Sequence, residues 1–533
     1  MPKVLISDEL APEAAERLAR LFSVDYRPGL THEELLAAIS EYDALLVRSA
    51  TKVDAEVMRR GERLQIVGRA GVGIDNVDVE EATRRGIAVV NVPDGNTIAA
   101  TEHTFALILA LARHVPDAVS ALRGGRWQRD FIGRQLYGKV LGIVGLGRIG
   151  REVAHRALSF GMRVVGFDPY LDPQQVPSEV EYQPDLHDVL RQAQILTVHT
   201  PLTAQTRHMI GAEELAALPP GAWVVNCARG GIVDEKALLE ALDSGQVGGA
   251  ALDVYETEPA TSNPLLRHPH VVATPHLGAS TAEAQLLNAV EVADEVIRWF
   301  QKKPLKNAVN LPRLSAEEWE QVRPWLLLAR ILGPLLAQAE PTAVRRVQVL
   351  VPVRGRAGDF LADTVLAGLL RAVHGGDVNV INASTTAKRL DVEVQVSQPR
   401  ADDAERERRL GLRLEGQPGA ERREAAGHID VDGTPRIVLL DGYPIDLVPR
   451  EHMMISRHRD IPGIVGKVGS VMGEVGVNIA EMRLGRKTVG GEAVMVLVTD
   501  QEVDGTTLRR LRDLPDVMAI QAIQLPDLAE EGL

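Results

Sequence analysis

The N-terminal part of the chain alternates short apolar runs with segments of helical periodicity, which is the pattern of parallel α/β units. Buried strands are expected at residues 3–7, 42–47, 64–67 and 88–92, with a helix over 11–21. A long helix is expected over residues 97–113. Because it is apolar nearly all round, it is expected to be buried between domains or subunits.

A second series of the same kind begins at Gly138. Its strands are expected at residues 140–144, 163–167, 195–199, 222–226, 249–254 and 270–273, with helical stretches between them. A helix over 282–301 could return to the first domain. We therefore expect two doubly wound parallel-sheet domains, a substrate domain made of 1–97 and 284–313 and a dinucleotide-binding domain made of 98–283.

The remaining residues follow a different pattern. Residues 315–450 indicate an α+β domain, with helices expected over 316–340 and 358–374 and a strand over 390–397. The charged stretch 400–423 is interpreted as a solvated helix or loop. Residues 451–533 read as strand, helix, two strands, helix and strand, which is the order of a ferredoxin-like βαββαβ domain.

Charge and cysteine content narrow the function classes. The formal net charge is −14, from 73 acidic and 59 basic residues, which argues against general nucleic-acid binding and means that an anionic substrate needs local arginines. Cys227 is the single cysteine, so no intramolecular disulfide is possible and no metal site is expected. The chain shows neither a signal peptide nor an apolar run near 18 residues, and we expect a cytoplasmic protein with no membrane partner.

Residues 145–150, with the sequence GLGRIG, fit the G-x-G-x-x-G pattern of dinucleotide-binding loops. A glycine-rich turn is the plain alternative, but an expected strand precedes the loop and an expected helix follows it. Gly145 permits the tight turn, Gly147 lets the backbone approach a pyrophosphate, and Gly150 lets the helix pack on the strand. Asp168, 18 residues after Gly150, is placed to bind ribose hydroxyls and to repel a 2′-phosphate, which favours NAD over NADP.

Four polar residues lie where apolar strands are expected to end, and ligands bind at that edge of parallel sheets. His276 suits a proton-transferring base, and a carboxylate such as Glu258 would orient its ring and favour the imidazolium. Arg229 can hold a substrate carboxylate with two hydrogen bonds. Asp253 is the fourth. Taken singly, each of these residues is also compatible with a structural role.

The segments NCARGGIVDE, ALDVYETEP and TPHLGAST resemble the signature segments of D-isomer-specific 2-hydroxyacid dehydrogenases, over about residues 1–313. The resemblance implies that Arg229 holds the substrate and that Glu258 pairs with His276, the acid/base. It also implies an NAD cofactor. The cofactor contacts that it implies, besides the glycine loop, come from Arg148, Ile149, Asp168, Thr200, Cys227 and Asp253. For Cys227, a small buried thiol without a cofactor role is equally compatible.

Arg48 and Arg69 follow expected strands, and Asn96 lies in the segment PDGNTIAATEH. Two arginines would suit a substrate with a second anionic group such as a phosphate, but paired surface arginines explain them equally well. Arg129 is a weaker candidate that would come from a neighbouring subunit. The segments resemble the branch of the family that oxidises 3-phospho-D-glycerate to 3-phosphooxypyruvate, the first step of the phosphorylated route to L-serine.

The C-terminal part resembles the intervening domain and the ACT domain, a small-molecule sensor, of that branch. The match departs most around residues 400–423. In ACT domains a ligand usually binds near the first strand–helix turn, and here His458, Asp460 and Asn478 lie near that turn. An L-serine effector and a homodimer or homotetramer are therefore expected. A tyrosine can stand where His458 stands, which weakens the case for serine, and the alternative is a domain that only joins subunits.

Two rival functions stay open at this point. One is another 2-hydroxyacid dehydrogenase, such as a glyoxylate or hydroxypyruvate reductase, although the long C-terminal part speaks against it. The other is a non-catalytic NAD sensor of the co-repressor type built on the same scaffold.

Overall fold

The computed structural model describes residues 1–339, 344–399, 409–416 and 422–526. The chain divides into two compact units. Unit 1 comprises Met1–Asn91 and Val290–Leu533, and unit 2 comprises Val92–Ala289. Helix α11 (Ala282–Phe300) begins in unit 2 and ends in unit 1.

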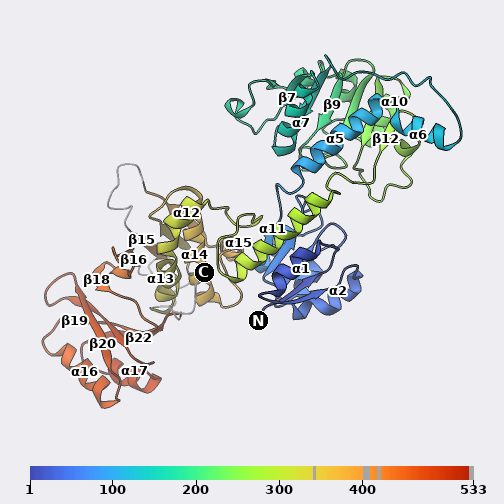
Figure 1. The fold of residues 1–533 in the computed structure, drawn as a ribbon. Coiled ribbons are helices and arrows are strands. Elements are labelled where there is room, and N and C mark those ends of the chain that lie inside the picture. Colours follow the sequence, from blue (N-terminus) through green and yellow to red (C-terminus); the bar gives the residue numbers. More distant parts are fainter. Residues whose placement is uncertain (340–343, 400–408, 417–421, 527–533) are drawn as a thin grey trace. The chain divides into compact units, whose positions relative to one another are not determined.

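Unit 1 begins with a five-stranded parallel sheet in the order β2-β1-β3-β4-β5 (Figure 1). The strands are β1 (Lys3–Ile6), β2 (Ser23–Tyr26), β3 (Ala44–Val47), β4 (Ile66–Arg69) and β5 (Ala88–Val90), and the helices are α1 (Pro12–Ala19), α2 (His32–Ala38), α3 (Ala55–Arg60) and α4 (Val79–Arg85). Side chains of Thr31, Asp54 and Asp78 accept backbone N–H groups and thereby begin α2, α3 and α4. In the register of β3 and β4, Val47 lies opposite Arg69, so Arg48 and Arg69 reach the same edge of the sheet.

Unit 2 contains a seven-stranded parallel sheet in the order β12-β11-β10-β9-β6-β7-β8. The strands are β6 (Val140–Val144), β7 (Arg163–Phe167), β8 (Glu181–Tyr182), β9 (Ile195–Val198), β10 (Ala222–Asn226), β11 (Val247–Leu252) and β12 (Val271–Ala273). The helices are α5 (Thr97–Ala112), α6 (Val115–Arg123), α7 (Arg148–Ser159), α8 (Leu186–Leu190), α9 (Ala212–Ala217) and α10 (Glu235–Asp243). One core contains buried residues of α5 and α7, and another contains residues of α8, α9 and α10, so helices cover both faces. The doubly wound fold is confirmed.

Helix α5 is a core helix of unit 2. Phe105, Leu107, Ile108 and Leu111 are all at most 8 % exposed and belong to the core that α5 shares with α7 and the sheet. Among the described helices, none is by itself long and apolar enough to cross a membrane; α5 and α6 reach that length only together and meet at a bend of 65°.

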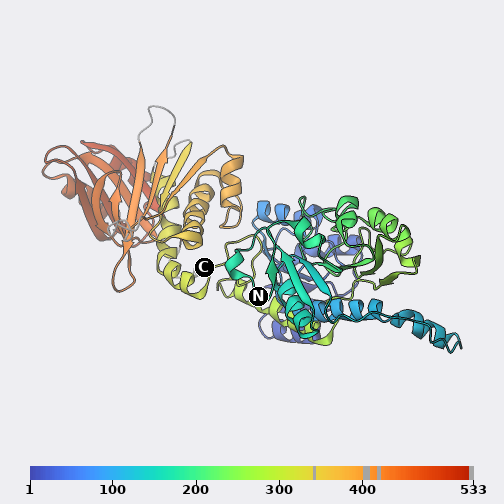
Figure 2. The ribbon, with the colours of Figure 1, turned by 90° about the horizontal axis from the view of Figure 1, so that it is seen from above.

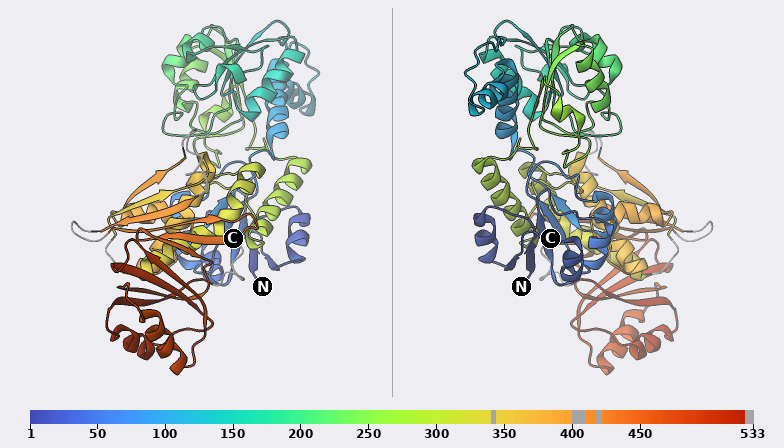
Figure 3. Two further views of the ribbon diagram at one scale, coloured as in Figure 1. Left: turned by 90° about the vertical axis from the view of Figure 1, so that its left-hand side faces the viewer. Right: turned by 90° about the vertical axis from the view of Figure 1, so that its right-hand side faces the viewer.

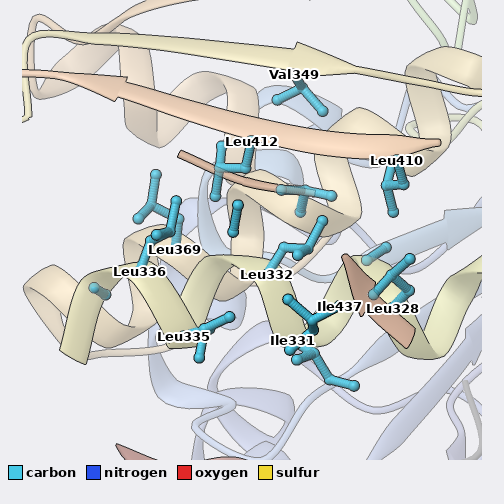
Figure 4. Packing of buried hydrophobic residues seen from close by; sticks show 14 of the residues in the cluster. Leu328, Ile331, Leu332, Leu335, Leu336, Val349, Leu369, Leu410, Leu412 and Ile437 are labelled. Carbon is cyan, nitrogen blue, oxygen red and sulfur yellow. The ribbon is translucent and has the colours of Figure 1, made fainter. Parts of the chain in front are cut away.

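The region after α11 folds as helices on a six-stranded mixed sheet in the order β14-β13-β15-β16-β17-β18 (Figure 2). The helices are α12 (Ala316–Val322), α13 (Leu326–Ala339), α14 (Gly355–His374) and α15 (Ala383–Arg389). The strands are β13 (Arg346–Leu350), β14 (Glu393–Ser397), β15 (Leu410–Glu415), β16 (Arg423–Ile429), β17 (Pro435–Leu440) and β18 (Tyr443–Leu447). Figure 4 shows Leu410 and Leu412 of β15 above Leu332 and Leu336 of α13, and Val349 of β13 belongs to the same core.

Two sequence expectations for this region were wrong. The helix expected over 316–340 is interrupted by a 3₁₀ turn, Arg323–Trp325, because Pro324 has no N–H for a helical hydrogen bond. Within the charged stretch expected as helix or loop, Leu410–Glu415 is instead a buried strand, while residues 400–408 and 417–421 lie outside the described part of the chain.

The C-terminal domain is an antiparallel sheet in the order β20-β21-β19-β22 with two helices (Figure 3). Its elements are β19 (His452–Arg459), α16 (Ile464–Glu474), β20 (Ile479–Arg486), β21 (Glu492–Thr499), α17 (Gly505–Arg512) and β22 (Val517–Gln524), which confirms the βαββαβ order. Met454, Leu497 and Ile520 pack with the helices. Met453 and Val496 point to the other face and belong to the core of the preceding domain, so both faces of this sheet are covered.

Candidate active site

The loops after β11 and β12 bring His276 and Glu258 into contact. His276 Nδ1 lies 2.9 Å from Glu258 Oε2. The other carboxylate oxygen of Glu258 accepts the backbone N–H of Tyr255 at 3.1 Å, which fixes the carboxylate against the loop. With Nδ1 donating to Glu258, Nε2 is the nitrogen that can exchange a proton with a substrate. Both side chains are accessible, at 47 % and 39 % exposed.

Asp253 holds the loop that carries His276. Its carbonyl accepts the His276 N–H at 2.8 Å, and its carboxylate accepts the N–H groups of Leu277 and Gly278, each at 2.8 Å. These bonds support a left-handed backbone at His276, with φ +56°, which a residue other than glycine rarely adopts. The loop therefore takes its shape from a buried carboxylate.

Two further side chains complete this anchor. Asp253 accepts the hydroxyl of Thr274 at 2.6 Å, and Nε2 of His103 lies 3.1 Å from the same oxygen. Burial alone would raise the pKa of Asp253, but the hydrogen bonds from His103, Thr274 and Leu277 outweigh burial and lower it. Sequence reasoning missed His103 and Thr274. The available signal was a histidine inside an apolar helix, because a buried polar group needs a partner.

Arg229 lies in the loop after β10, beside the loop that carries Glu258. Asn226 holds this loop by donating to the Arg229 carbonyl at 2.9 Å and accepting the Ala228 N–H at 3.0 Å. A Cβ at Gly230 would lie 1.8 Å from the Tyr255 carbonyl oxygen, so only glycine permits this approach. Strands β10, β11 and β12 are neighbours in a parallel sheet, and Arg229, Glu258 and His276 follow their carboxyl ends at one edge.

The glycine loop has the shape that a dinucleotide requires. Gly145 has φ +94°, and a Cβ there would lie 2.7 Å from the His199 carbonyl oxygen. A Cβ at Gly150 would lie 2.0 Å from the Gly145 carbonyl oxygen. At Gly147, by contrast, a Cβ would meet open space, as expected where a phosphate group approaches. Gly147 begins α7 without a side-chain cap, so the first N–H groups of this helix are available to an anion.

Other predicted cofactor residues surround this loop. Asp168 accepts the N–H groups of Leu146 and Tyr170, each at 3.0 Å, which directs its carboxylate to the loop. The Thr200 hydroxyl is buried and has no hydrogen-bond partner among the described residues, which fits a missing polar ligand. Arg148, the first residue of α7 and the neighbour of Ile149, pairs with Asp94.

Cys227 is 8 % exposed and belongs to the core beside the sheet. Burial raises the pKa of its thiol to about 12, so the thiol is neutral. This environment is compatible both with a cofactor-pocket wall and with a plain core residue.

The expected phosphate-binding residues occupy two different units. Arg48 and Arg69 lie in unit 1, at neighbouring strand ends, and Arg48 Nη1 donates to the Glu9 carbonyl at 3.3 Å. Asn96 lies in unit 2 at the start of α5, where its side-chain oxygen is buried with no hydrogen-bond partner in the described part of the chain.

The residues predicted near the first turn of the C-terminal domain form no hydrogen bond with one another. His458 is fully buried on the same side of β19 as Met454, neither ring nitrogen has a partner among the described residues, and burial lowers its pKa. Asp460 accepts from Gly490 N–H at 3.2 Å and from Arg486 at 3.3 Å. Asn478 donates to Asp500 at 2.6 Å.

The fold and this site define an NAD-dependent 2-hydroxyacid dehydrogenase. The sequence matches three family models: the NAD-binding domain of D-isomer specific 2-hydroxyacid dehydrogenases at residues 105–278, the D-3-phosphoglycerate dehydrogenase intervening domain at 321–441, and the ACT domain at 453–516. Because relatives named D-3-phosphoglycerate dehydrogenase are 39% identical over 98% or more of the chain, it belongs to that family, and the resemblance noted in the sequence is confirmed.

Individual relatives cover the chain almost end to end. D-3-phosphoglycerate dehydrogenase of Methanocaldococcus jannaschii is 39% identical over 530 residues, which are 98% of this chain and 100% of that protein. The Bacillus subtilis enzyme of the same name is 39% identical over 99% of this chain and 100% of its own length. The crystal structure of the TT0316 protein from Thermus thermophilus superposes with a TM-score of 0.54 at 36% identity, covering 58% of this chain and 99% of that one.

Proposed function

We propose that the chain oxidises 3-phospho-D-glycerate to 3-phosphooxypyruvate with NAD, the first step of the phosphorylated route to L-serine. The observation that carries this proposal is the 2.9 Å contact between His276 and Glu258, at the edge of the sheet where Arg229 also lies. The identity of the substrate is inferred from the names of the full-length relatives.

The chain's own residues account for each part of the reaction. Arg229 holds the substrate carboxylate and thereby orients C2. Nε2 of His276 takes the hydroxyl proton as the C2–O bond becomes a carbonyl, and Glu258 stabilises the imidazolium that results. When bound, NAD would supply the acceptor for the hydride from C2. Its pyrophosphate would be held by the glycine loop and the start of α7, and its ribose by Asp168.

The test is an assay of the purified full chain with NAD and 3-phospho-D-glycerate, followed by NADH absorbance. D-glycerate is the matched substrate without the phosphate. Turnover of the phosphorylated acid with little turnover of D-glycerate would support the proposal. Turnover of glyoxylate or hydroxypyruvate alone would make the chain a different 2-hydroxyacid dehydrogenase. NADH binding with no turnover of any of these would make it an NAD sensor.

We also propose that the chain forms a homodimer or homotetramer. Helix α6 and the loop after it expose six large apolar side chains in unit 2: Val115, Val119, Leu122, Trp127, Ile132 and Tyr137. An exposed apolar set of this kind is typical of a subunit contact. Arg129 lies in the same exposed loop. If this loop forms the subunit contact, Arg129 of one subunit would lie close to the other subunit. Light scattering of wild type and of Trp127→Asp tests this, with a shift to smaller mass expected for the variant.

L-serine is proposed as the effector of the ACT domain. Asp460 and Asn478 provide a carboxylate and an amide near the turn before α16, but both are hydrogen-bonded within the domain, so serine would have to replace these bonds. Calorimetry of the full chain with L-serine tests binding, and the dehydrogenase assay tests inhibition. No heat and no inhibition at millimolar serine would leave the domain as an assembly module.

The limits 1–97 with 284–313, 98–283, 315–450 and 451–533 are proposed as domain boundaries. The three family matches, at 105–278, 321–441 and 453–516, each fall inside one of these limits, which supports the division. Limited proteolysis tests it, with the first cuts expected near residues 313 and 450.

A further inference from the structure

Unit 1 contains a cavity of about 500 Å³ that has no role in the proposed reaction. Its walls are the end of α11, the segment that follows it, and helices α12, α13 and α14. Its walls include the large apolar residues Trp299, Phe300, Leu311, Trp319, Leu326 and Phe360. We call this cavity the linker pocket. Its volume falls in the range of about 300–1,000 Å³ that small-molecule sites usually have.

Among the described residues, the charged side chains that line the linker pocket are all cationic. Lys302, Lys303, Arg330 and Arg371 line it, and none of the described residues that line it is Asp or Glu. This is unusual in a chain whose net charge is −14. An all-cationic lining therefore does not follow from the composition.

Two of these cations, Lys303 and Arg371, donate to neutral groups. Lys303 Nζ donates to the side-chain oxygen of Gln301 at 2.8 Å, and Arg371 Nε donates to the Val378 carbonyl at 2.9 Å. Elsewhere in unit 1, arginines on comparable surfaces lie against carboxylates, as Arg63 does with Asp43 at 3.0 Å. Among the residues described here, neither Lys302, Lys303 nor Arg371 forms an ion pair.

We propose that the linker pocket binds a small organic anion with an apolar body, such as an aromatic or aliphatic carboxylate or phosphate ester. Water in this cavity would leave apolar wall residues such as Trp299 and Phe360 wetted. Lys302 and Lys303 are exposed at its rim, where they can attract an anion. An amphipathic anion covers the apolar walls and supplies the missing negative charge at once. The phosphorylated substrate of the proposed reaction is polar throughout and does not fit this lining.

The probe for this test is 8-anilinonaphthalene-1-sulfonate, an anion with an aromatic body. It is titrated into the full chain with saturating NAD present, so that the dinucleotide site is not available to it. N-phenyl-1-naphthylamine, which has a similar body and no charge, is the matched probe. Trp299 and Trp319 line the pocket, so energy transfer from tryptophan to the probe is expected on binding, and its loss in Trp299→Phe would assign the signal to this site.

Three variants locate the binding. Lys303→Glu is expected to weaken binding of the anionic probe by about tenfold, because a repulsive charge replaces an attractive one. Lys467→Glu, which makes the same charge change on the exposed face of α16, is expected to leave binding unchanged. Ala367→Trp fills the cavity from α14 and is expected to abolish binding. Circular dichroism establishes that each variant is folded, and Thr364→Phe replaces Ala367→Trp if the larger side chain prevents folding.

Equal affinity for the neutral and the anionic probe would overturn the proposal, because the pocket would then be an apolar crevice without charge selectivity. Unchanged binding in Lys303→Glu and in both cavity-filling variants would also overturn it, since the probe would bind elsewhere. Neither result depends on the dehydrogenase activity, so the proposed reaction and the proposed site are tested independently.

Discussion

Nε2 of His103 lies 3.1 Å from the carboxylate of Asp253, across 150 residues of sequence. Asp253 in turn accepts the two N–H groups that follow His276. Helix α5 is thereby linked to the loop that carries the acid/base, and His103 and Asp253 are positioning residues for His276.

The first prediction concerns this link. Asp253→Asn is expected to lower kcat by about 10- to 100-fold, because hydrogen bonds to a charged group contribute ~1.5–3 kcal/mol and an amide cannot accept all of them. Thr274→Ser keeps a hydroxyl at the anchor and is the matched control, expected to remain within about twofold of wild type. A loss of kcat with unchanged thermal unfolding in Asp253→Asn would support positioning. Loss of stability with normal kcat in the folded fraction would contradict it.

The second prediction concerns cofactor choice. Asp168 directs its carboxylate to the glycine loop through the Leu146 N–H, and no cation follows it in Pro169 and Tyr170. Asp168→Ala is expected to narrow the ratio of kcat/KM for NAD over NADP, because the charge that repels a 2′-phosphate is removed. The measurement is kcat/KM with NAD and with NADP, for the wild type and for Asp168→Ala. Comparable use of both cofactors by the wild type would show that the ribose assignment is wrong.

The third prediction concerns the phosphate. Arg48 and Arg69 lie at neighbouring strand ends in unit 1. Arg48→Gln and Arg69→Gln are each expected to raise KM for 3-phospho-D-glycerate by about tenfold or more, and to change the rate with D-glycerate much less. Arg59→Gln, on the exposed surface of α3, is the control and is expected to change neither rate. Equal losses on both substrates would mean that Arg48 and Arg69 support the fold and do not bind the phosphate.

The fourth prediction concerns pH and stability. Burial lowers the pKa of His199 to about 4, from an ordinary value of 6.5. Between these two values the unfolded chain binds a proton that the folded chain does not, so the free energy of unfolding falls as the pH falls through this window. At pH 5 the contribution is at most about 2 kcal/mol. Urea unfolding of wild type and His199→Gln at pH 7.5 and pH 5 checks this, and an equal pH dependence in the two proteins would contradict it.

The sequence predicted the parallel sheets well because their strands are continuous apolar runs. Strands at 140–144, 163–167 and 222–226 were predicted to the residue. The strand Leu410–Glu415 was missed, since its alternating Leu410, Leu412 and Leu414 are embedded in a charged stretch and are visible only at period two.

For the candidate site, the sequence predicted the residues that follow strands and missed those joined by a long-range contact. His276, Glu258 and Arg229 follow strands, and parallel strands place their ends together, so sequence position implied proximity. His103 and Thr274 act through a contact that spans the chain between helix α5 and the loop after β12. A histidine inside an apolar helix signals that a partner is needed, but only the tertiary structure shows that the partners are Asp253 and Thr274.

A double-mutant cycle on kcat for 3-phospho-D-glycerate oxidation tests the central claim, that His276 and Glu258 act as a pair. His276→Ala is expected to lose about 10²- to 10⁴-fold in kcat while NADH binding stays near normal. Glu258→Gln is expected to lower kcat in the wild-type background, because the ring loses the carboxylate that holds Nδ1, and to have little further effect in His276→Ala. Wild-type turnover in His276→Ala, or a Glu258→Gln loss of the same size with and without His276, would contradict the account.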